Sequence, residues 1–578
     1  MDRTEEQANA SVELDALQRE YWERQLREFP ELSTWTGDNR YNDRLTDLSL
    51  EAIERRKTDE RRMLEQARGI DRSRLSGQDR LSHALLLFEL ELAVQAQQFP
   101  PVMLLNQIWG PQLMLPQLVS VTPFRTAQDY RDYLHRLIAF PRYLEQVIGL
   151  LRIGIQLGWV QPSWPLRGVP DQIQGQLVSD VGQSALYAPL LHMPETIPED
   201  EREQLRSAAR RYIADGVFPA LTKIREFVTE TYLPAGDRPI AASLLPDGEA
   251  YYAHCVYEHT TSELRPADIH QIGLTEVTRI RAEMNSVLQE TGFKGSLQEF
   301  GSFLRSDPRF YYTKAEDLVT AYRDIAKRAD AELPKLFAEL PRTPYGVRAF
   351  PDYEAPSQTT AQYYPGAADG SRAGYFLVNT YRLDMRPSFE MEALTLHEAV
   401  PGHHLQIARA QELRHLPDFR RNASYTAYVE GWALYAESLG SRMGFYADPY
   451  SRFGQLTYEM WRACRLVVDT GLHQFGWTRQ QAIDYLRENT AKTEQDIAVE
   501  VDRYIVWPGQ ALAYKIGELK IKELRAKAER ELQSRFDLGR FHNALLDNGP
   551  LPLALLEREI EGWIEAQKAA HTKLPSFI

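Results

Sequence analysis

Apolar residues recur at intervals of three and four along most of this chain, and this spacing limits the possible folds more than any other feature. Residues 81–99, 318–340 and 521–536 each carry such an apolar stripe. A stripe of this kind lies along one face of an α-helix and needs a partner surface to cover it. The sequence therefore predicts a mainly α fold in which amphipathic helices pack against one another.

Strand signals are scarce by comparison. The best candidate is residues 374–381, GYFLVNTY, which are rich in β-branched and aromatic side chains and follow a glycine-rich turn. Residues 200–228 are predicted to form two helices broken at Gly216–Pro219. No linker or repeat divides the chain. We expect one helical unit with two lobes packed together, an N-terminal helical region over residues 1–240 and a second region over 241–578.

Charge and cysteine content narrow the classes of function. The formal net charge is −14, which disfavours nucleic acid because phosphate binding needs a basic surface. Two cysteines, Cys255 and Cys464, cannot form a disulfide framework. The first residues lack the basic and apolar parts of a signal peptide, and no apolar run is long enough to span a bilayer. We expect a cytoplasmic protein without a nucleic-acid or membrane partner.

The segment HEAVPGHH, residues 397–404, begins like the metal-binding helix of a zinc peptidase. In that helix two histidines lie one turn apart, and the glutamate after the first acts as general base. His397 and Glu398 supply the opening pair. Pro401 occupies the place of the second histidine, and the next histidines are His403 and His404.

An unbroken helix cannot bring either late histidine to an ion held by His397. His403 would lie roughly 240° around the helix and about 9 Å along it, whereas His404 would regain the face about 10 Å away. Pro401 removes a backbone donor and crowds the preceding turn, and Gly402 permits unusual dihedral angles. We predict that the helix opens at this Pro-Gly pair and returns His403 as the second ligand. His404 is the alternative, and the histidine that is not a ligand would support one or contact substrate.

The third ligand is predicted on the next apolar helix, residues 424–440. Glu430 lies 27 residues after His403, which leaves room for one helix to end and a second to return antiparallel to it. A buried glutamate is costly unless it is paired or binds a metal. We assign Glu430 as the ligand and Glu437, on the same face, as a carboxylate that supports a ligand. The alternative is a Glu–Arg pair in a helical core.

These motifs resemble DUF885, a bacterial family of unknown function whose mark is HExxPGHH followed by an EGWALY helix. Here the two motifs read HEAVPGHH and EGWALYAE. Residues 245–274, 465–482 and 503–517 also resemble that family, so the likeness extends over nearly the whole chain.

The chain is also similar to helical, gluzincin-type zinc oligopeptidases such as thimet oligopeptidase and angiotensin-converting enzyme. That resemblance implies a large two-lobed helical body with a deep cleft and a small β-sheet beside the HE…GHH helix. It also implies late tyrosine and histidine side chains that stabilise the oxyanion. On this basis Tyr504 and Tyr514 are predicted to be catalytic, and His473 is predicted to contact substrate.

Three further positions are predicted from their local pattern. The strand at 374–381 would bind an extended peptide through main-chain bonds if it lay at a sheet edge, with Asn379 as a substrate contact. Arg503 is a candidate for a substrate carboxylate. Arg465 and Asp469, four residues apart, are predicted to pair within one helix.

The function predicted is zinc-dependent hydrolysis of peptide bonds in short peptides. Zn²⁺ would polarise the scissile carbonyl and acidify a water molecule, while Glu398 takes the proton and passes it to the leaving amine. One alternative is a non-haem iron enzyme, because iron is also bound by two histidines and a carboxylate. Glu398 favours the hydrolase, since an oxygenase needs no base beside a ligand. The other alternative is a non-catalytic peptide-binding protein on the same fold.

Overall fold

In the computed structural model of the chain, the described residues are 3–351, 355, 359–367, 370 and 372–572. The chain forms two compact units, Met1–Tyr251 and Tyr252–Ile578. The division falls close to the predicted lobe boundary at residue 240, and the packing of the two lobes as one body stays a prediction. None of the described helices is long and apolar enough to cross a membrane.

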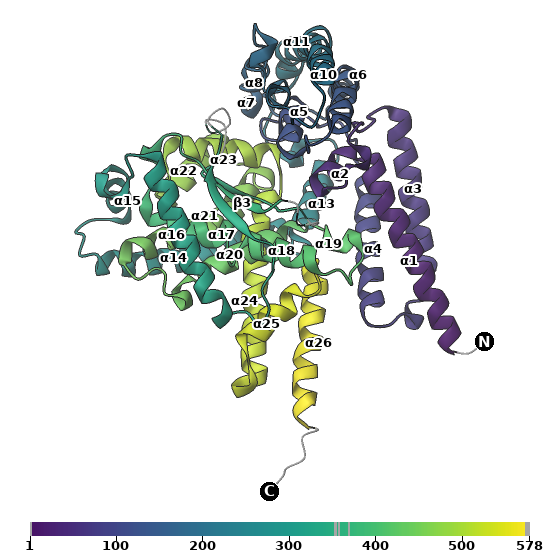
Figure 1. Cartoon of the computed structure of the whole chain (residues 1–578). Helices are drawn as coiled ribbons and strands as arrows, with labels where there is room; N and C mark the ends of the chain where they lie inside the picture. The colour runs from purple at the N-terminus through teal and green to yellow at the C-terminus, as the bar shows by residue number, and fades with distance from the viewer. Residues whose placement is uncertain (1–2, 352–354, 356–358, 368–369, 371, 573–578) are drawn as a thin grey trace. The chain divides into compact units, whose positions relative to one another are not determined.

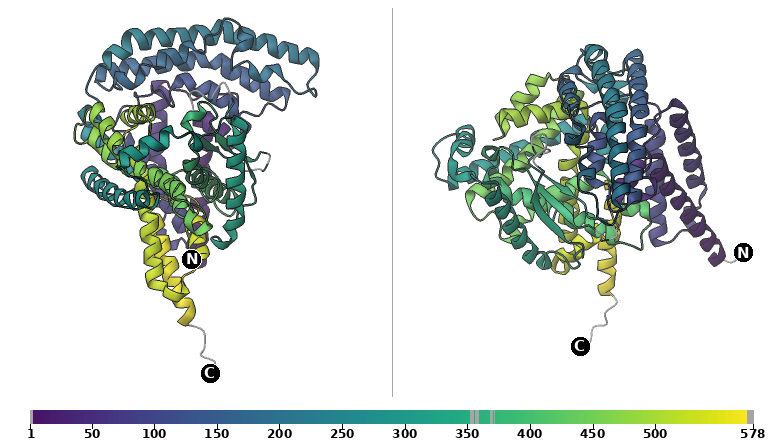
Figure 2. Two further views of the ribbon diagram at one scale, coloured as in Figure 1. Left: turned by 90° about the vertical axis from the view of Figure 1, so that its left-hand side faces the viewer. Right: turned by 45° about the horizontal axis from the view of Figure 1, so that its top comes forward.

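The described part of the N-terminal unit is built from helices. α1 (Arg3–Glu28), α3 (Leu50–Gly69) and α4 (Gly77–Ala96) pack side by side (Figure 1). α6 (Ala127–Leu157) runs along α10 (Glu199–Tyr212) and α11 (Phe218–Phe227) (Figure 2). Shorter helices complete the unit: α2 (Pro30–Thr36), α5 (Pro111–Val121), α7 (Ser163–Leu166), α8 (Val169–Gln174), α9 (Ala188–Leu191) and α12 (Leu233–Ala235).

The predicted break at Gly216–Pro219 is wrong. α10 continues into α11 through a single π turn, Ile213–Val217. The extra residue in a π turn widens the helix locally, which accommodates the ring and the missing donor of Pro219 without ending the helix. A second π turn, Val228–Tyr232, leads into α12.

The C-terminal unit contains long buried helices. α14 (Pro266–Glu290) packs along α21 (Pro449–His473), most of whose side chains are buried. α17 (Met391–Glu398), α18 (His403–Glu412) and α20 (Thr426–Ser438) lie near them. The unit also includes α15 (Leu297–Ser306), α16 (Ala315–Glu332), α19 (Asp418–Arg421), α22 (Arg479–Asn489), α23 (Glu494–Val506), α24 (Ala513–Leu532), α25 (Leu538–Leu546) and α26 (Leu553–Thr572), while α13 (Gly248–Thr260) begins in the first unit.

A small sheet precedes the HEAVPGHH segment. Its strands are β1 (Tyr345–Ala349), β2 (Ala361–Tyr364) and β3 (Gly374–Val378), in the order β1-β3-β2. β1 is parallel to β3, and β2 is antiparallel to it. The predicted strand therefore exists, but the idea that it forms a sheet edge is wrong, because both of its sides are paired.

Asn379 follows β3 and is buried. Its side-chain Nδ2 donates to the carbonyl oxygens of Ala355 and Thr359, each at 2.9 Å. The amide thus binds the main chain at Ala355 and Thr359, and its predicted contact with substrate stays a prediction.

α20 and α24 cross in very close contact because a glycine lies at the crossing point on each helix. A Cβ atom on Gly517 would lie 1.8 Å from the carbonyl oxygen of Ala427. A Cβ atom on Gly431 would lie 2.5 Å from the main chain of Gly517. The crossing fixes the position of Glu430, which directly precedes Gly431.

Replacing Gly517 by alanine is expected to lower the free energy of unfolding by about 1–3 kcal/mol, because the added methyl group forces the two helices apart. Gly562→Ala is a matched control on the exposed side of α26, where a Cβ atom meets nothing within 4 Å. It should raise stability by about 0.5–1 kcal/mol through helix propensity. Urea unfolding of both variants measures the difference, and equal midpoints would contradict the close crossing.

Candidate metal centre

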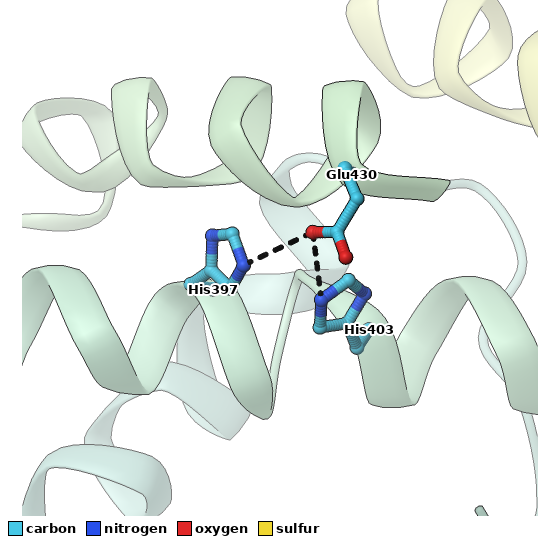
Figure 3. Close-up of side chains that lie close together, drawn as sticks. All are labelled: His397, His403 and Glu430. Carbon is cyan, nitrogen blue, oxygen red and sulfur yellow. Dashed lines mark ion pairs between the residues drawn. The ribbon is translucent and has the colours of Figure 1, made fainter. Parts of the chain in front are cut away.

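The HEAVPGHH segment is divided between two helices. α17 ends at Glu398, α18 begins at His403, and residues 399–402 form a turn between them (Figure 3). The predicted opening of the helix at the Pro-Gly pair is confirmed.

Two contacts explain this turn. A Cβ atom on residue 402 would lie 1.9 Å from the carbonyl oxygen of His397, so the turn requires Gly402. The carbonyl oxygen of Pro401 accepts a hydrogen bond of 2.8 Å from Trp432 Nε1. Trp432 belongs to α20, so the turn is anchored to the helix that carries Glu430.

His397, His403 and Glu430 converge (Figure 3). Glu430 Oε2 lies 3.6 Å from His397 Nε2 and 3.4 Å from His403 Nε2. One candidate ligand atom from each of the three residues lies within 4.8 Å of the other two. The three side chains therefore point at a common centre.

The separations fit a shared metal ion. Ligand atoms at about 2.0–2.1 Å from a tetrahedral Zn²⁺ lie about 3.4 Å from one another. Glu430 Oε2 is buried and, apart from its ion pairs with His397 and His403, has no hydrogen-bond partner among the described residues. Two imidazole nitrogens and a carboxylate oxygen form a donor set suited to Zn²⁺, and equally to iron.

Glu437 lies behind His397 and is completely buried. Its Oε1 accepts a hydrogen bond of 2.8 Å from His397 Nδ1, and Arg462 Nη2 lies 3.6 Å from the same oxygen. Burial opposes the charged ring, but Glu430 and Glu437 outweigh it and raise the pKa of His397 to about 9. Burial likewise opposes the charge of Glu430, yet His403 and His397 hold the pKa of this carboxyl well below its usual range. A metal ion would thus have to displace a proton from His397.

His404 contacts the sheet instead of the three converging residues. Its Nδ1 lies 2.8 Å from the hydroxyl of Tyr363, and its ring centroid lies 4.5 Å from that of Tyr345. Burial lowers the pKa of His404 to about 4. The structure therefore brings His403, and not His404, to His397.

Glu398, the predicted general base, is the last residue of α17 and is half-buried. Within the described part of the chain, no hydrogen bond or ion pair engages its carboxylate. A general base must accept a proton from water, so an unengaged carboxylate on the residue after the candidate ligand His397 suits this role.

A family model described as "Bacterial protein of unknown function (DUF885)" matches residues 30–560. The chain belongs to the DUF885 family. The resemblance carried by HEAVPGHH and EGWALYAE is thereby confirmed.

Two solved structures share the fold of this DUF885 chain. One is described as the "putative lipoprotein" from Colwellia psychrerythraea, with 29% sequence identity and a TM-score of 0.91, covering 96% of this chain and 99% of that chain. The other is a "putative lipoprotein of unknown function" from Shewanella oneidensis, with 16% identity and a TM-score of 0.70, covering 94% and 98%. No curated protein matches the chain.

Two late residues predicted to act on substrate are enclosed in the DUF885 fold. The Tyr504 side chain is 1% exposed, and its hydroxyl accepts hydrogen bonds from Arg465 Nε at 2.9 Å and Trp461 Nε1 at 3.2 Å. His473 is completely buried, with Nε2 at 2.9 Å from the carbonyl oxygen of Tyr504. Both side chains are packed between α21 and α23 with these polar atoms engaged, and their predicted contacts with substrate stay predictions.

Tyr514 and Arg503 are placed differently. Tyr514 lies in the first turn of α24, one turn before Gly517, where α24 meets α20 beside Glu430. Its hydroxyl lies 3.4 Å from Arg503 Nη2, and this guanidinium also bonds to Gln510. Of the two tyrosines predicted to be catalytic, Tyr514 lies on the helix that crosses α20 next to the candidate ligand Glu430.

The predicted pair within α21 is wrong. Arg465 Nη2 instead lies 2.9 Å from Glu500 Oε2 on α23. Asp469 accepts hydrogen bonds from the Tyr252 hydroxyl at 2.7 Å and from the Gly509 amide at 3.1 Å. A spacing of four residues allows Arg465 and Asp469 to pair, but residues of other segments bind each of them instead.

Sequence reasoning did not identify Trp461 and Arg462 as functional residues. Arg462 reaches Glu437, while the Trp461 ring lies beneath the guanidinium groups of Arg462 and Arg465, at 5.2 and 4.7 Å. The sequence signal for these contacts is the pair of arginines three residues apart, Arg462 and Arg465, among the apolar residues of this helix, because such charges need partners in the core.

Proposed function

We propose that this protein is a zinc-dependent hydrolase that cleaves amide bonds in short peptides. The observation that supports this most strongly is the convergence of His397, His403 and Glu430. The residue that follows His397 in the sequence, Glu398, has an unengaged carboxylate. Structural zinc sites have four protein ligands, whereas catalytic sites have three and an open position. A set of three ligands with an adjacent base therefore favours catalysis.

When bound, Zn²⁺ would polarise the scissile carbonyl and acidify a water molecule. Glu398 accepts the proton of the attacking water and passes it to the leaving amine. Glu437 holds His397 through Nδ1 and so directs Nε2 to the centre. Tyr514 donates its hydroxyl hydrogen to the developing oxyanion.

The resemblance of the HEAVPGHH and EGWALYAE motifs to those of the helical gluzincin oligopeptidases supports the same reaction, and we extend the proposal to a two-lobed body with a peptide-binding cleft. The cytoplasmic location and the absence of nucleic-acid and membrane partners stay predictions from the sequence. The lipoprotein descriptions belong to the two solved relatives.

Metal analysis combined with a peptide library tests this proposal. Protein purified without added metal should contain about one zinc per chain and should cleave members of a synthetic library of short peptides, as read by mass spectrometry. Chelation should abolish cleavage, and added Zn²⁺ should restore it. Iron in place of zinc, or an intact library after incubation with zinc-loaded protein, would contradict the proposal.

A further inference from the structure

Two arginines share one carboxylate among α21, α23 and α24. Arg465 Nη2 lies 2.9 Å from Glu500 Oε2, and Arg503 Nη1 lies 3.3 Å from the same oxygen. Tyr504 and Tyr514 complete what we call the arginine cluster, which consists of Arg465, Glu500, Arg503, Tyr504 and Tyr514.

Arg465 has a hydrogen-bond donor left over. Nε donates to Tyr504 and Nη2 to Glu500, but Nη1 is buried and has no hydrogen-bond partner within the described residues. A buried donor without an acceptor is costly, and a guanidinium edge matches the two oxygens of a carboxylate. The unused donor indicates a ligand that is an acceptor.

The rings around Arg465 contact the faces of its guanidinium group and do not use its donors. The guanidinium carbon lies 4.7 Å from the centre of the Trp461 ring and 4.5 Å from that of Tyr514. Cation–π contacts engage the flat faces of the guanidinium group, so its N–H donors remain directed along the edge.

The buried charges around Lys515, in the same unit, are balanced. Around Lys515, every cation has at least one carboxylate, in the set Lys515, Arg279, Lys522, Glu276, Glu459, Glu518 and the more exposed Glu283. The arginine cluster instead has two cations and one carboxylate. Asp469 also acts on Arg503 electrostatically, but its oxygens are engaged by Tyr252 and Gly509. A second carboxylate is therefore missing from the cluster.

The cluster is connected to the metal centre from two sides. Tyr514 lies one turn, or about 4.5 Å of helix rise, from the crossing next to Glu430. Arg462, one turn before Arg465 on α21, reaches Glu437 behind His397. A short peptide bound at the centre would thus have these donors within a few residues of the scissile bond.

We propose that the arginine cluster binds the free C-terminal carboxylate of the peptide substrate. This inference rests on the proposed function and narrows it to cleavage near a C-terminus, as in a carboxypeptidase or dipeptidase. The carboxylate would accept from Arg465 Nη1 and from Arg503, giving two anions for two cations. Arg503 is the accessible member, with 15% of its side chain exposed against 4% for Arg465.

Peptide acids and amides test the cluster by activity. For N-acetyl-Ala-Ala-Phe, the wild-type protein should show a kcat/KM about 10- to 100-fold higher than for the corresponding C-terminal amide. Arg503→Gln should remove that preference by slowing the acid alone, and Arg503→Lys should recover part of it. Arg479→Gln is the matched control, because Arg479 is also partly buried and pairs with Asp502 of the same helix as Glu500. It should leave both rates unchanged. Equal losses for acid and amide in Arg503→Gln would overturn the proposal.

A binding measurement separates this inference from the proposed function. Chelator-treated protein, titrated in a calorimeter, should bind N-acetylphenylalanine at least tenfold tighter than its amide, and Arg503→Gln should bind both equally. Selective binding of the acid without hydrolysis of any peptide would support the carboxylate site and contradict the proposed hydrolase activity. Equal binding and equal hydrolysis of acid and amide would retain the hydrolase and exclude the carboxylate site.

Discussion

Glu398→Gln is expected to lower kcat/KM for a short peptide by about 10²- to 10⁴-fold while zinc stays bound. Glutamine has the same shape as glutamate but cannot accept the proton of the attacking water. The three candidate ligands are unchanged, and no described ion pair or hydrogen bond depends on the Glu398 carboxylate. Initial rates and metal content measured on the same sample give the two quantities.

An exposed glutamate provides the control for this variant. Glu316, in the first turn of α16, is exposed, so Glu316→Gln should behave like the wild-type protein. Both variants should keep the wild-type unfolding midpoint, which excludes loss of activity through loss of fold. Full peptide hydrolysis by zinc-loaded Glu398→Gln would rule out the mechanism.

Elements encoded by local patterns are predictable from this sequence. The stripes at 318–340 and 521–536 lie largely in α16 and α24, because an amphipathic face is a property of consecutive residues. The order of the sheet is not local, so the central position of β3 does not follow from its composition. The local pattern also fails to predict that the helix continues through Pro219. Proline usually ends a helix, but here a single π turn accommodates it.

The same distinction applies to the site. His397, Glu398 and Glu430 lie in short segments whose residue types already indicate a metal, and the structure brings the two candidate ligands among them together. The partner of Arg465 depends on how α21 meets α23, which spacing within α21 cannot show. Tyr504 was predicted from a resemblance, and only packing reveals that its hydroxyl is enclosed.

His403→Ala and His404→Ala are expected to have different consequences for zinc binding. His403→Ala removes a candidate ligand and should weaken zinc binding by more than about 100-fold, beyond the 10- to 100-fold typical of losing a group that supports a ligand. His404→Ala leaves the three candidate ligands in place, and zinc affinity should change by less than about tenfold.

Both variants should lower the stability of the metal-free fold. His404→Ala removes the buried hydrogen bond to Tyr363 and the ring contact with Tyr345, so the free energy of unfolding of the metal-free protein should fall by about 1–3 kcal/mol. His403 Nε2 lies 3.4 Å from Glu430 Oε2 and helps to keep that buried carboxyl charged, so His403→Ala should also destabilise the metal-free fold. Zinc titration against a competing chelator and urea unfolding of the chelated proteins measure the two effects. Loss of zinc from His404→Ala with retention by His403→Ala would mean that His404 is the ligand. That result would contradict the turn at residues 399–402 as this structure has it.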